Sequence, residues 1–348
     1  MINKLINPMK PMKQSSVTLK DVAKTAGVSH QTVARVVRKS PKVAEKTRIK
    51  VQQAIADAGY LPNRMAQQLA RRQSLTLGFV SINISLHAIA KIADGIRREA
   101  LKQGFSLSIS MMNELDQDSC NKAIDELLGQ QVDGLIINTS ITHATIKLIQ
   151  ERENLPPCVF IDFDKNNDAL QVSHDQVGGA SLAAQHLIDL GHRNIALING
   201  AANTCVAHWR ESGWLESLSK VNITPVNRMD GNWNARSGYQ ATLELLDAET
   251  DFTAILVAND EMCLGVLRAL NERNINVPQD VSVVGFDNHD DSEFYNPPLT
   301  TIDQNCHELG ETAVTLLMQK MNSEQQSESR VLLTTKLVKR QSSGPVKT

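Results

Sequence analysis

Beyond residue 74 the sequence alternates between short apolar runs and longer amphipathic stretches. The apolar runs have the length of buried strands, and the amphipathic stretches carry apolar residues at helical spacing. Strands are predicted at 75–82, 105–112, 133–139, 158–163, 194–199, 253–259 and 281–287. Helices are predicted around 89–100, 124–128, 176–190, 206–219, 235–248 and 260–273. Alternating strands and helices form parallel sheets covered on both faces, so the two series predict two doubly wound α/β subdomains.

Residues 17–58 show a different pattern, with three short amphipathic segments. Thr18 followed by Asp21 has the spacing of a capping box, and Gly27 suits a tight turn between two helices. Ser29 is a good N-cap for the second helix. Two short helices joined through a glycine turn, with a third that completes the core, predict an all-α helix-turn-helix head.

The third segment of the head begins at Ala44, which has no side-chain group that could cap a helix, and ends at Gly59. Its apolar positions are Val43, Ile49, Val51, Ile55 and Ala58.

The second helix of the head has two chemically different faces. Its apolar face carries Val33, Val36 and Val37. The opposite face carries three long polar side chains, those of His30, Gln31 and Arg35. In a helix-turn-helix the second helix enters the major groove, where Arg recognises guanine and Gln recognises adenine. These three side chains are therefore the candidate base readers.

The charge distribution supports this interpretation of the head. The whole chain has a net charge of only −2. Residues 1–74, however, hold 15 Lys and Arg against 3 Asp and Glu, a net charge of +12, and the remaining 274 residues hold 21 against 35, a net charge of −14. A basic head on an acidic body is typical of a polyanion-binding module joined to a second function. The alternative is a basic tail that is merely solvated.

Several function classes are disfavoured by what the sequence lacks. It has no apolar run long enough to span a membrane and no secretory signal, and its five cysteines are widely spaced without a CxxC pair, as expected of thiols in the cytoplasm. The segment 162–168 begins like a calcium loop, but Asn167 stands at the position of the required glycine and Ser173 at that of the required glutamate. No phosphate-binding or dinucleotide-binding motif occurs. We therefore expect no cofactor, no metal and no enzymatic activity, although Asp162 with Asp287 could form the carboxylate pair of a glycosidase.

Polar residues follow the predicted strands of the body. Asp162, Asn259 and Asp287 each come at the end of an apolar run, and Arg210 and Trp233 lie in the second subdomain. Ligands bind at the carboxyl ends of parallel strands. Carboxylates and amides suit sugar hydroxyls, Arg can span two neighbouring oxygens, and an aromatic ring covers the C–H face of a sugar. Taken singly, each residue could instead be a helix cap or a core residue.

The segments VTLKDVAKTAGVSHQTVARVV (17–37), VAEKTRIKV (43–51) and GYLPNRMAQQLARRQS (59–74) resemble the LacI/GalR family of bacterial repressors, and the resemblance extends over 17–340. It implies that 59–74 is a hinge that forms a short helix on operator DNA, with Leu69 wedged between base pairs. It also implies a body similar to periplasmic sugar-binding proteins. The implied DNA-binding residues are Thr18, Ser29, His30, Gln31, Thr32, Arg35, Asn63, Ala66 and Leu69.

The resemblance also implies a ligand site and a dimer interface. The implied effector-binding residues are Leu86, Ala88, Ile92, Asp162, Arg210, Trp233, Asn259, Asp287 and Gln304. His87 and Asp291 match a pair that lies across a dimer interface. Four positions depart from the matched pattern: His30 replaces a tyrosine, Ala44 occupies a helix-start position that is often serine, Cys306 replaces an aromatic pocket residue, and Val206 replaces a serine. The changes at His30, Cys306 and Val206 affect the expected base preference and the expected sugar.

The expected domains are an unmatched extension (1–16), the head (17–58), the hinge (59–74), the body (75–340) and a tail (341–348). Within the body, the first subdomain is expected at about 75–173 and 306–333, and the second at about 174–303 and 334–340.

The predicted function is a cytoplasmic, homodimeric transcriptional repressor of a sugar-utilisation operon. It binds a pseudo-palindromic operator and is released by a sugar inducer, a galactoside. A dimer is expected because the tail has no leucine heptad. The alternatives are another sugar, a corepressor such as a purine, or a sugar-binding protein without DNA function.

Overall fold

The computed structural model describes residues 17–37, 40–60, 73–138, 143–162, 168–248, 251–323 and 329–347. It divides into two compact units, Met1–Gln73 and Ser74–Thr348, which are described separately here as the head and the body.

The head contains three helices, α1 (Leu19–Ala26), α2 (His30–Val37) and α3 (Glu45–Asp57). The predicted capping box is confirmed, because Thr18 and Asp21 each bond the backbone N–H of the other. Gly27 adopts a left-handed φ of 57°, which explains the glycine after α1. Ser29 Oγ accepts from the Thr32 N–H at 3.1 Å and so caps α2 as predicted.

The core of the head confirms most of the predicted apolar positions and corrects one. Val22, Val33 and Val51 are fully buried, one from each helix. Ile49, however, is 59% exposed, so its assignment to the core is wrong. Successive helical residues are about 100° apart, so Ile49 lies far around α3 from Val51 and from Ala54, which is buried one turn later.

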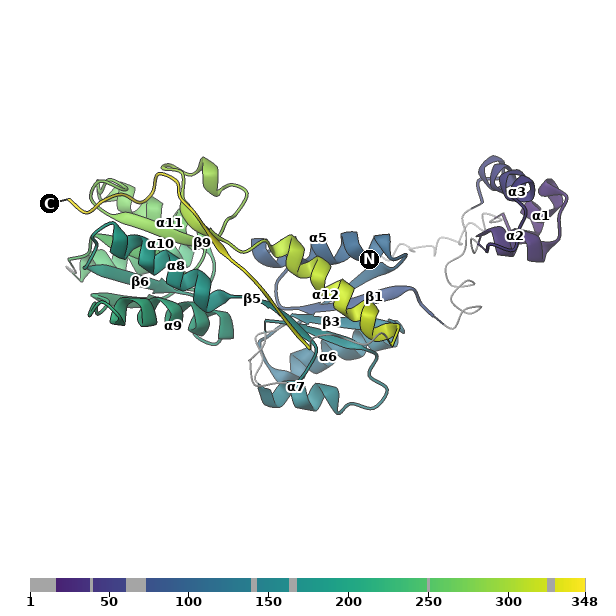
Figure 1. The fold of residues 1–348 in the computed structure, drawn as a ribbon, viewed down its shortest axis with the longest axis horizontal. Helices are drawn as coiled ribbons and strands as arrows, with labels where there is room; N and C mark the ends of the chain where they lie inside the picture. The colour runs from purple at the N-terminus through teal and green to yellow at the C-terminus, as the bar shows by residue number, and fades with distance from the viewer. Residues whose placement is uncertain are drawn as a thin grey trace, which may run out of the picture. The chain divides into compact units, whose positions relative to one another are not determined.

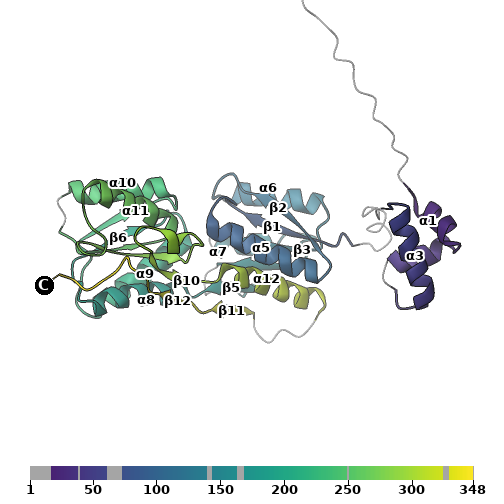
Figure 2. The ribbon, with the colours of Figure 1, turned by 90° about the horizontal axis from the view of Figure 1, so that it is seen from above.

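The body contains two six-stranded sheets, each with helices on both faces (Figures 1 and 2). The first sheet has the order β11-β5-β4-β3-β1-β2 and the second the order β12-β10-β9-β8-β6-β7. The strands of the first sheet are β1 (Thr76–Ser81), β2 (Ser106–Met111), β3 (Gly134–Asn138), β4 (Cys158–Ile161), β5 (Gln171–His174) and β11 (Arg330–Leu333). Those of the second are β6 (Ile195–Asn199), β7 (Asn227–Asp230), β8 (Ala254–Val257), β9 (Ser282–Asp287), β10 (Thr300–Asp303) and β12 (Lys336–Val338).

The helices form pairs on opposite faces of each sheet. The pair on one face of the first sheet is α5 (His87–Lys102) with α12 (Cys306–Met321), and the opposite face carries α6 (Gln117–Gly129) and α7 (His143–Gln150). The second subdomain pairs α8 (Gln176–Asp189) with α9 (Cys205–Ser219), and α10 (Ala235–Asp247) with α11 (Asp260–Glu272). A short 3-10 helix, η1 (Ser292–Phe294), follows β9. Within the described residues, no helix is long and apolar enough to cross a membrane.

Five strands lie outside the apolar runs from which strands were predicted. Strands β7, β11 and β12 are only partly buried, and β5 is mostly buried but has a single apolar residue, Val172. Strand β10 is buried but contains two threonines, whose polarity hides it from a hydrophobicity pattern. The sheets are parallel as predicted, except that β12 pairs antiparallel with β10.

The C-terminal segment joins the two subdomains. Strand β11 pairs in the first sheet and β12 in the second, as the yellow strand in Figure 1 shows. The chain also crosses between the sheets after β5 and after β10. Residues 341–347, expected only as a tail, are instead part of the second subdomain: Ser342 is fully buried and exchanges hydrogen bonds with Val283.

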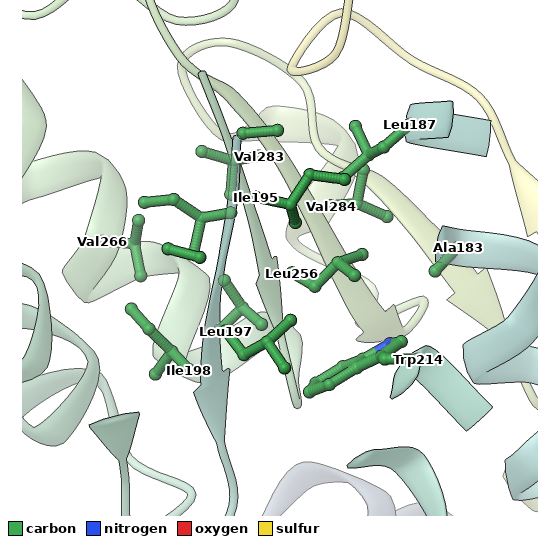
Figure 3. Packing of buried hydrophobic residues seen from close by; sticks show 14 of the residues in the cluster. Ala183, Leu187, Ile195, Leu197, Ile198, Trp214, Leu256, Val266, Val283 and Val284 are labelled. Atoms are coloured by element: carbon green, nitrogen blue, oxygen red, sulfur yellow. The ribbon is translucent and has the colours of Figure 1, made fainter. Parts of the chain in front are cut away.

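Leu256 on β8 packs in the core of the second subdomain, and its removal should lower the stability of that core. It is fully buried in a cluster with Trp214 (Figure 3). We expect Leu256→Ala to lower the free energy of unfolding by about 3 kcal/mol, because it leaves a cavity. Leu182→Ala, at an exposed position on α8, is the matched control and should change it by less than about 0.5 kcal/mol. Urea unfolding followed by tryptophan fluorescence measures both, and equal effects would contradict the prediction.

Candidate functional site

A cleft lies between the two subdomains, at the carboxyl ends of strands from both sheets. It encloses about 810 Å³, including the space at its open mouth. The residues selected from the sequence for this cleft all line it: Leu86, Ala88, Ile92, Asp162, Arg210, Trp233, Asn259, Asp287 and Gln304. Folding therefore brings residues up to 218 positions apart in the chain, from Leu86 to Gln304, into one cavity.

Arg210, on α9, is only 3% exposed, and each of its three guanidinium nitrogens has a partner. Its Nε donates to Gln176 Oε1 at 2.9 Å, and its Nη1 donates to the carbonyl of Ala258. Its Nη2 lies 3.2 Å from Asp287 Oδ1 and 3.4 Å from Gln304 Oε1. Because an unpaired buried charge is very costly, these partners fix the position of the guanidinium.

Two aromatic rings flank the same guanidinium. Its Cζ lies 3.7 Å from the ring centroid of Phe286 and 5.6 Å from that of Trp233. Such cation–π contacts add to the stability of a desolvated Arg. Phe286 belongs to the core, whereas Trp233 lines the cleft, so the cleft combines an aromatic ring with a fixed cation.

The loop that carries Trp233 is held in an unusual conformation. Trp233 has a left-handed φ of 64°, and its carbonyl accepts from Asn259 Nδ2 at 2.9 Å. Asn259 Oδ1 also caps α11 by accepting from the Met262 N–H at 2.9 Å. Asn259, selected from the sequence as a ligand contact, is thus a positioning residue as well.

The two aspartates of the cleft differ in their surroundings. Burial raises the pKa of Asp287 to about 6, although the positive charge of Arg210 opposes the shift. Asp287 Oδ1 also accepts from Gln304 Nε2 at 2.6 Å. Burial likewise raises the pKa of Asp162, whose Oδ1 accepts from Ser173 Oγ at 3.0 Å. Asp287 is therefore mainly ionised at neutral pH and able to accept from ligand hydroxyl groups.

The cleft wall also contains residues that the sequence pattern did not indicate: Asn138, His174, Gln176, Glu261 and His289. Asn138 ends a predicted strand, so the rule that selected Asp162 could have found it. His174 ends β5, which was not among the predicted strands. No metal site is present in the described parts of the chain, where no three His, Cys, Asp or Glu side chains are suitably grouped.

His87 and Asp291, selected as a dimer-interface pair, occupy different environments within one chain. The His87 ring contacts the His289 ring, with centroids 3.5 Å apart and an interplanar angle of 33°, and both residues line the cleft. Burial lowers the pKa of His87 to about 4, so the ring is neutral at physiological pH. The Asp291 side chain is 77% exposed. Their contact across an interface stays a prediction.

The candidate base readers lie on the surface of the head. His30, Gln31 and Arg35 are all exposed on α2, opposite the buried Val33 and Val36. By contrast, Thr18, Ser29 and Thr32 already bond within the caps of α1 and α2. Asn63, Ala66 and Leu69 lie outside the described residues.

The head and the body together define a class of protein: a helix-turn-helix unit joined to a two-subdomain α/β unit with a ligand cleft. Models of known protein families match both parts of the chain. Residues 18–63 match the bacterial regulatory proteins of the lacI family, and residues 184–343 match the periplasmic binding protein-like domain.

Individual proteins extend this similarity over nearly the whole chain. The lactose operon repressor of Escherichia coli K12 is 40% identical over 93% of this chain and 90% of its own length. The ribose operon repressor of the same strain is 33% identical over 93% of this chain and 98% of its own. A crystal structure of the lac repressor dimer bound to operator and the anti-inducer ONPF superposes with a TM-score of 0.86, at 40% identity, and covers 94% of this chain and 99% of that one. The chain belongs to the LacI family of bacterial transcriptional repressors.

The Trp233 ring lies directly against the backbone of Gly200. A Cβ atom at Gly200 would overlap the six-membered ring of Trp233, so we expect Gly200→Ala to displace the indole. Near-ultraviolet circular dichroism should change in the tryptophan region. Gly129→Ala, where a Cβ meets nothing, is the control and should leave the spectrum unaltered. An unchanged Gly200→Ala spectrum would show that the ring is not held against this backbone.

Proposed function

We propose that this protein represses a sugar-utilisation operon and is released from its operator by a sugar inducer, a galactoside, bound in the cleft. The observation that carries the proposal is the set of fixed polar groups around Arg210, which share one cavity with Trp233. Membership of a repressor family and the similarity to lactose and ribose operon repressors support it.

The geometry of the cleft suits a sugar ring. The Trp233 indole offers an apolar surface for the C–H face of the ring. Asp287 and Arg210 offer an acceptor and a donor 3.2 Å apart, which matches neighbouring hydroxyl groups that each donate and accept. Leu86, Ala88 and Ile92 add an apolar wall from the first subdomain. Because the polar groups are already fixed by one another, a sugar binds without ordering them first.

The head supplies the DNA-binding half of the function. His30, Gln31 and Arg35 project from the exposed side of α2, where they would meet base edges in the major groove. The positive charge of residues 1–74 would bind the phosphates, and Thr18, Ser29 and Thr32 would add contacts near the capped helix ends. From the hinge, Asn63 and Ala66 would approach the minor groove of the operator, and Leu69 would insert between base pairs and kink the DNA duplex.

Induction requires that the sugar favours one arrangement of the subdomains. The cleft takes residues from both subdomains, so a bound ligand changes the free energy of closure. In a homodimer, with His87 and Asp291 at the interface, this change would move the two hinges apart and weaken operator binding. The protein would act on DNA in the cytoplasm.

The direct test is a gel-shift assay of the full chain on the DNA upstream of its own gene, with lactose, simple galactosides, ribose and a purine as effectors. We expect a galactoside to weaken the complex. Arg210→Ala should abolish this response and leave operator binding intact, because the arginine lies in the cleft. Arg228→Ala, at an exposed arginine of the same subdomain, is the matched control. If the purine and none of the sugars changes operator affinity, the sugar assignment is wrong.

Inducer binding should depend on the protonation state of Asp287. The carboxylate that pairs with Arg210 is protonated as the pH falls below about 6. The affinity for the inducer should therefore be constant above about pH 7 and decrease progressively below about 6. Between about pH 7.5 and about pH 5 we expect the dissociation constant of the inducer to rise roughly tenfold, because Asp287 takes up one proton. Tryptophan fluorescence titration measures it. Asp287→Asn should bind weakly at both pH values and show little dependence on pH. An unaltered wild-type affinity at pH 5 would contradict the role of this carboxylate.

A further inference from the structure

Side chains link the two subdomains in addition to the crossing segments of the chain. In the described residues the chain crosses after β5, after β10 and between β11 and β12. Two side-chain contacts join residues that belong to none of these crossings. Lys91 Nζ, on α5 of the first subdomain, donates to Asp290 Oδ2, in the loop after β9 of the second. One helical turn earlier on α5, the His87 ring contacts the ring of His289.

Both sides of these contacts are fixed to their own subdomain. The backbone N–H of His289 donates to Oδ2 of the fully buried Asp260 at 2.8 Å. The side-chain oxygen of Asn288 accepts from Arg340 Nη2 at 2.8 Å. On the opposite side, Ile96 buries α5 in the core of the first subdomain. Because the loop and the helix are each tied to one subdomain, the contacts between them depend on how the two subdomains are arranged.

The two contacts are chemically compatible with neutral pH. The hydrogen bond from Lys91 lowers the pKa of Asp290, so the carboxylate is ionised and the contact is an ion pair. Burial lowers the pKa of His87 and also that of His289, so both rings are neutral and approach each other without charge repulsion. His87 and His289 belong to the cleft wall, which places the contacts at the cleft.

We propose that Lys91 and Asp290 form a latch between the two subdomains that favours the closed arrangement, in which both walls of the cleft face one ligand. Separation of the subdomains would break the ion pair and the contact between the histidine rings, so the latch stabilises one arrangement and not the other. The Asp290 side chain is 65% exposed, and solvent weakens the pair. Its effect on the equilibrium between the arrangements is therefore about two- to fivefold.

The latch has a consequence for the effector. A sugar that contacts residues of both subdomains binds the closed arrangement more tightly, and the latch reduces the free energy needed to reach it. The ion pair therefore lowers the sugar concentration needed for induction. This part of the inference rests on the proposed function, because it takes the cleft as the effector site.

Cys306 provides a measure of cleft opening that needs no ligand. Its thiol is free, buried and part of the cleft wall, so a small alkylating reagent reaches it when the cleft opens. We expect Asp290→Asn and Lys91→Gln each to speed alkylation of Cys306 by iodoacetamide about two- to fivefold in the full-length protein. Peptide mass spectrometry measures the rate. Cys263, fully buried outside the cleft, should react at the wild-type rate throughout.

A charge swap and a matched control test the pair itself. The double variant Lys91→Asp with Asp290→Lys restores an ion pair and should return alkylation of Cys306 towards the wild-type rate. Asp247→Asn removes an ion pair with Arg273 inside the second subdomain, at a side chain that is 64% exposed, and should leave the rate unchanged. If neither single variant speeds alkylation, or if the charge swap does not slow it again, the latch is wrong.

Sugar binding by the same variants separates this inference from the proposed function. In isothermal titration of the full-length protein with isopropyl galactoside, each single variant should raise the dissociation constant about two- to fivefold, and the charge swap should reverse the change. If the wild-type protein binds no sugar, the proposed function fails, and the alkylation rates still decide whether the latch exists. If the single variants speed alkylation but bind the galactoside as tightly as wild type, the latch does not favour the ligand-binding arrangement and the inference is overturned.

Discussion

The buried guanidinium of Arg210 is the constraint on which the cleft depends. A charge removed from water must be bonded on all sides, and this requirement ties together elements that are distant in the sequence. The partners of Arg210 come from the start of α8, the end of β8, the end of β9 and the crossing segment after β10. A change at any of them leaves part of the charge unpaired. The same bonds that stabilise the second subdomain therefore also fix the groups that face a ligand.

Two of the residues that bond Arg210 lie next to or within the segments in which the chain crosses from one subdomain to the other. Gln176 follows the crossing after β5, and Gln304 lies in the crossing after β10. Both bond Arg210, and Gln176 Nε2 also donates to Gln304 Oε1 at 3.2 Å. A ligand that contacts Arg210 thus acts on groups attached to two of the crossing segments. If the cleft closes on a ligand as proposed, one hydrogen-bonded network would connect the ligand to both crossing segments, which is the physical requirement for coupling between binding and closure.

The cleft is prepared for a ligand at a cost to the free protein. Asp162, Trp233 and Asp287 all have backbone φ values in the left-handed region, which residues other than glycine rarely adopt. Two carboxyl groups are buried with raised pKa values, and two wall nitrogens are unsatisfied. The core around Trp214 and Leu256, in which both side chains are fully buried, stabilises the same subdomain. Part of the backbone strain and two of the unsatisfied polar atoms of the described residues therefore lie in the cleft wall.

The sequence by itself determined the local structure and the identity of many cleft residues. The capping box of Thr18, the glycine turn at Gly27 and the long apolar strands follow from interactions within a few residues, and the strand-end rule selected Asp162, Asn259 and Asp287. Only the tertiary structure decided the rest. Strands β7, β11 and β12 form because neighbouring strands offer hydrogen bonds, not because of their own apolar pattern, and Ile49 is exposed because the other helices cover a different face of α3. The bonding of Asn259 to the Trp233 loop, the contact of the His87 ring with the His289 ring and the unpaired nitrogens of Asn138 and His174 depend on contacts between segments far apart in the chain, which no local pattern encodes.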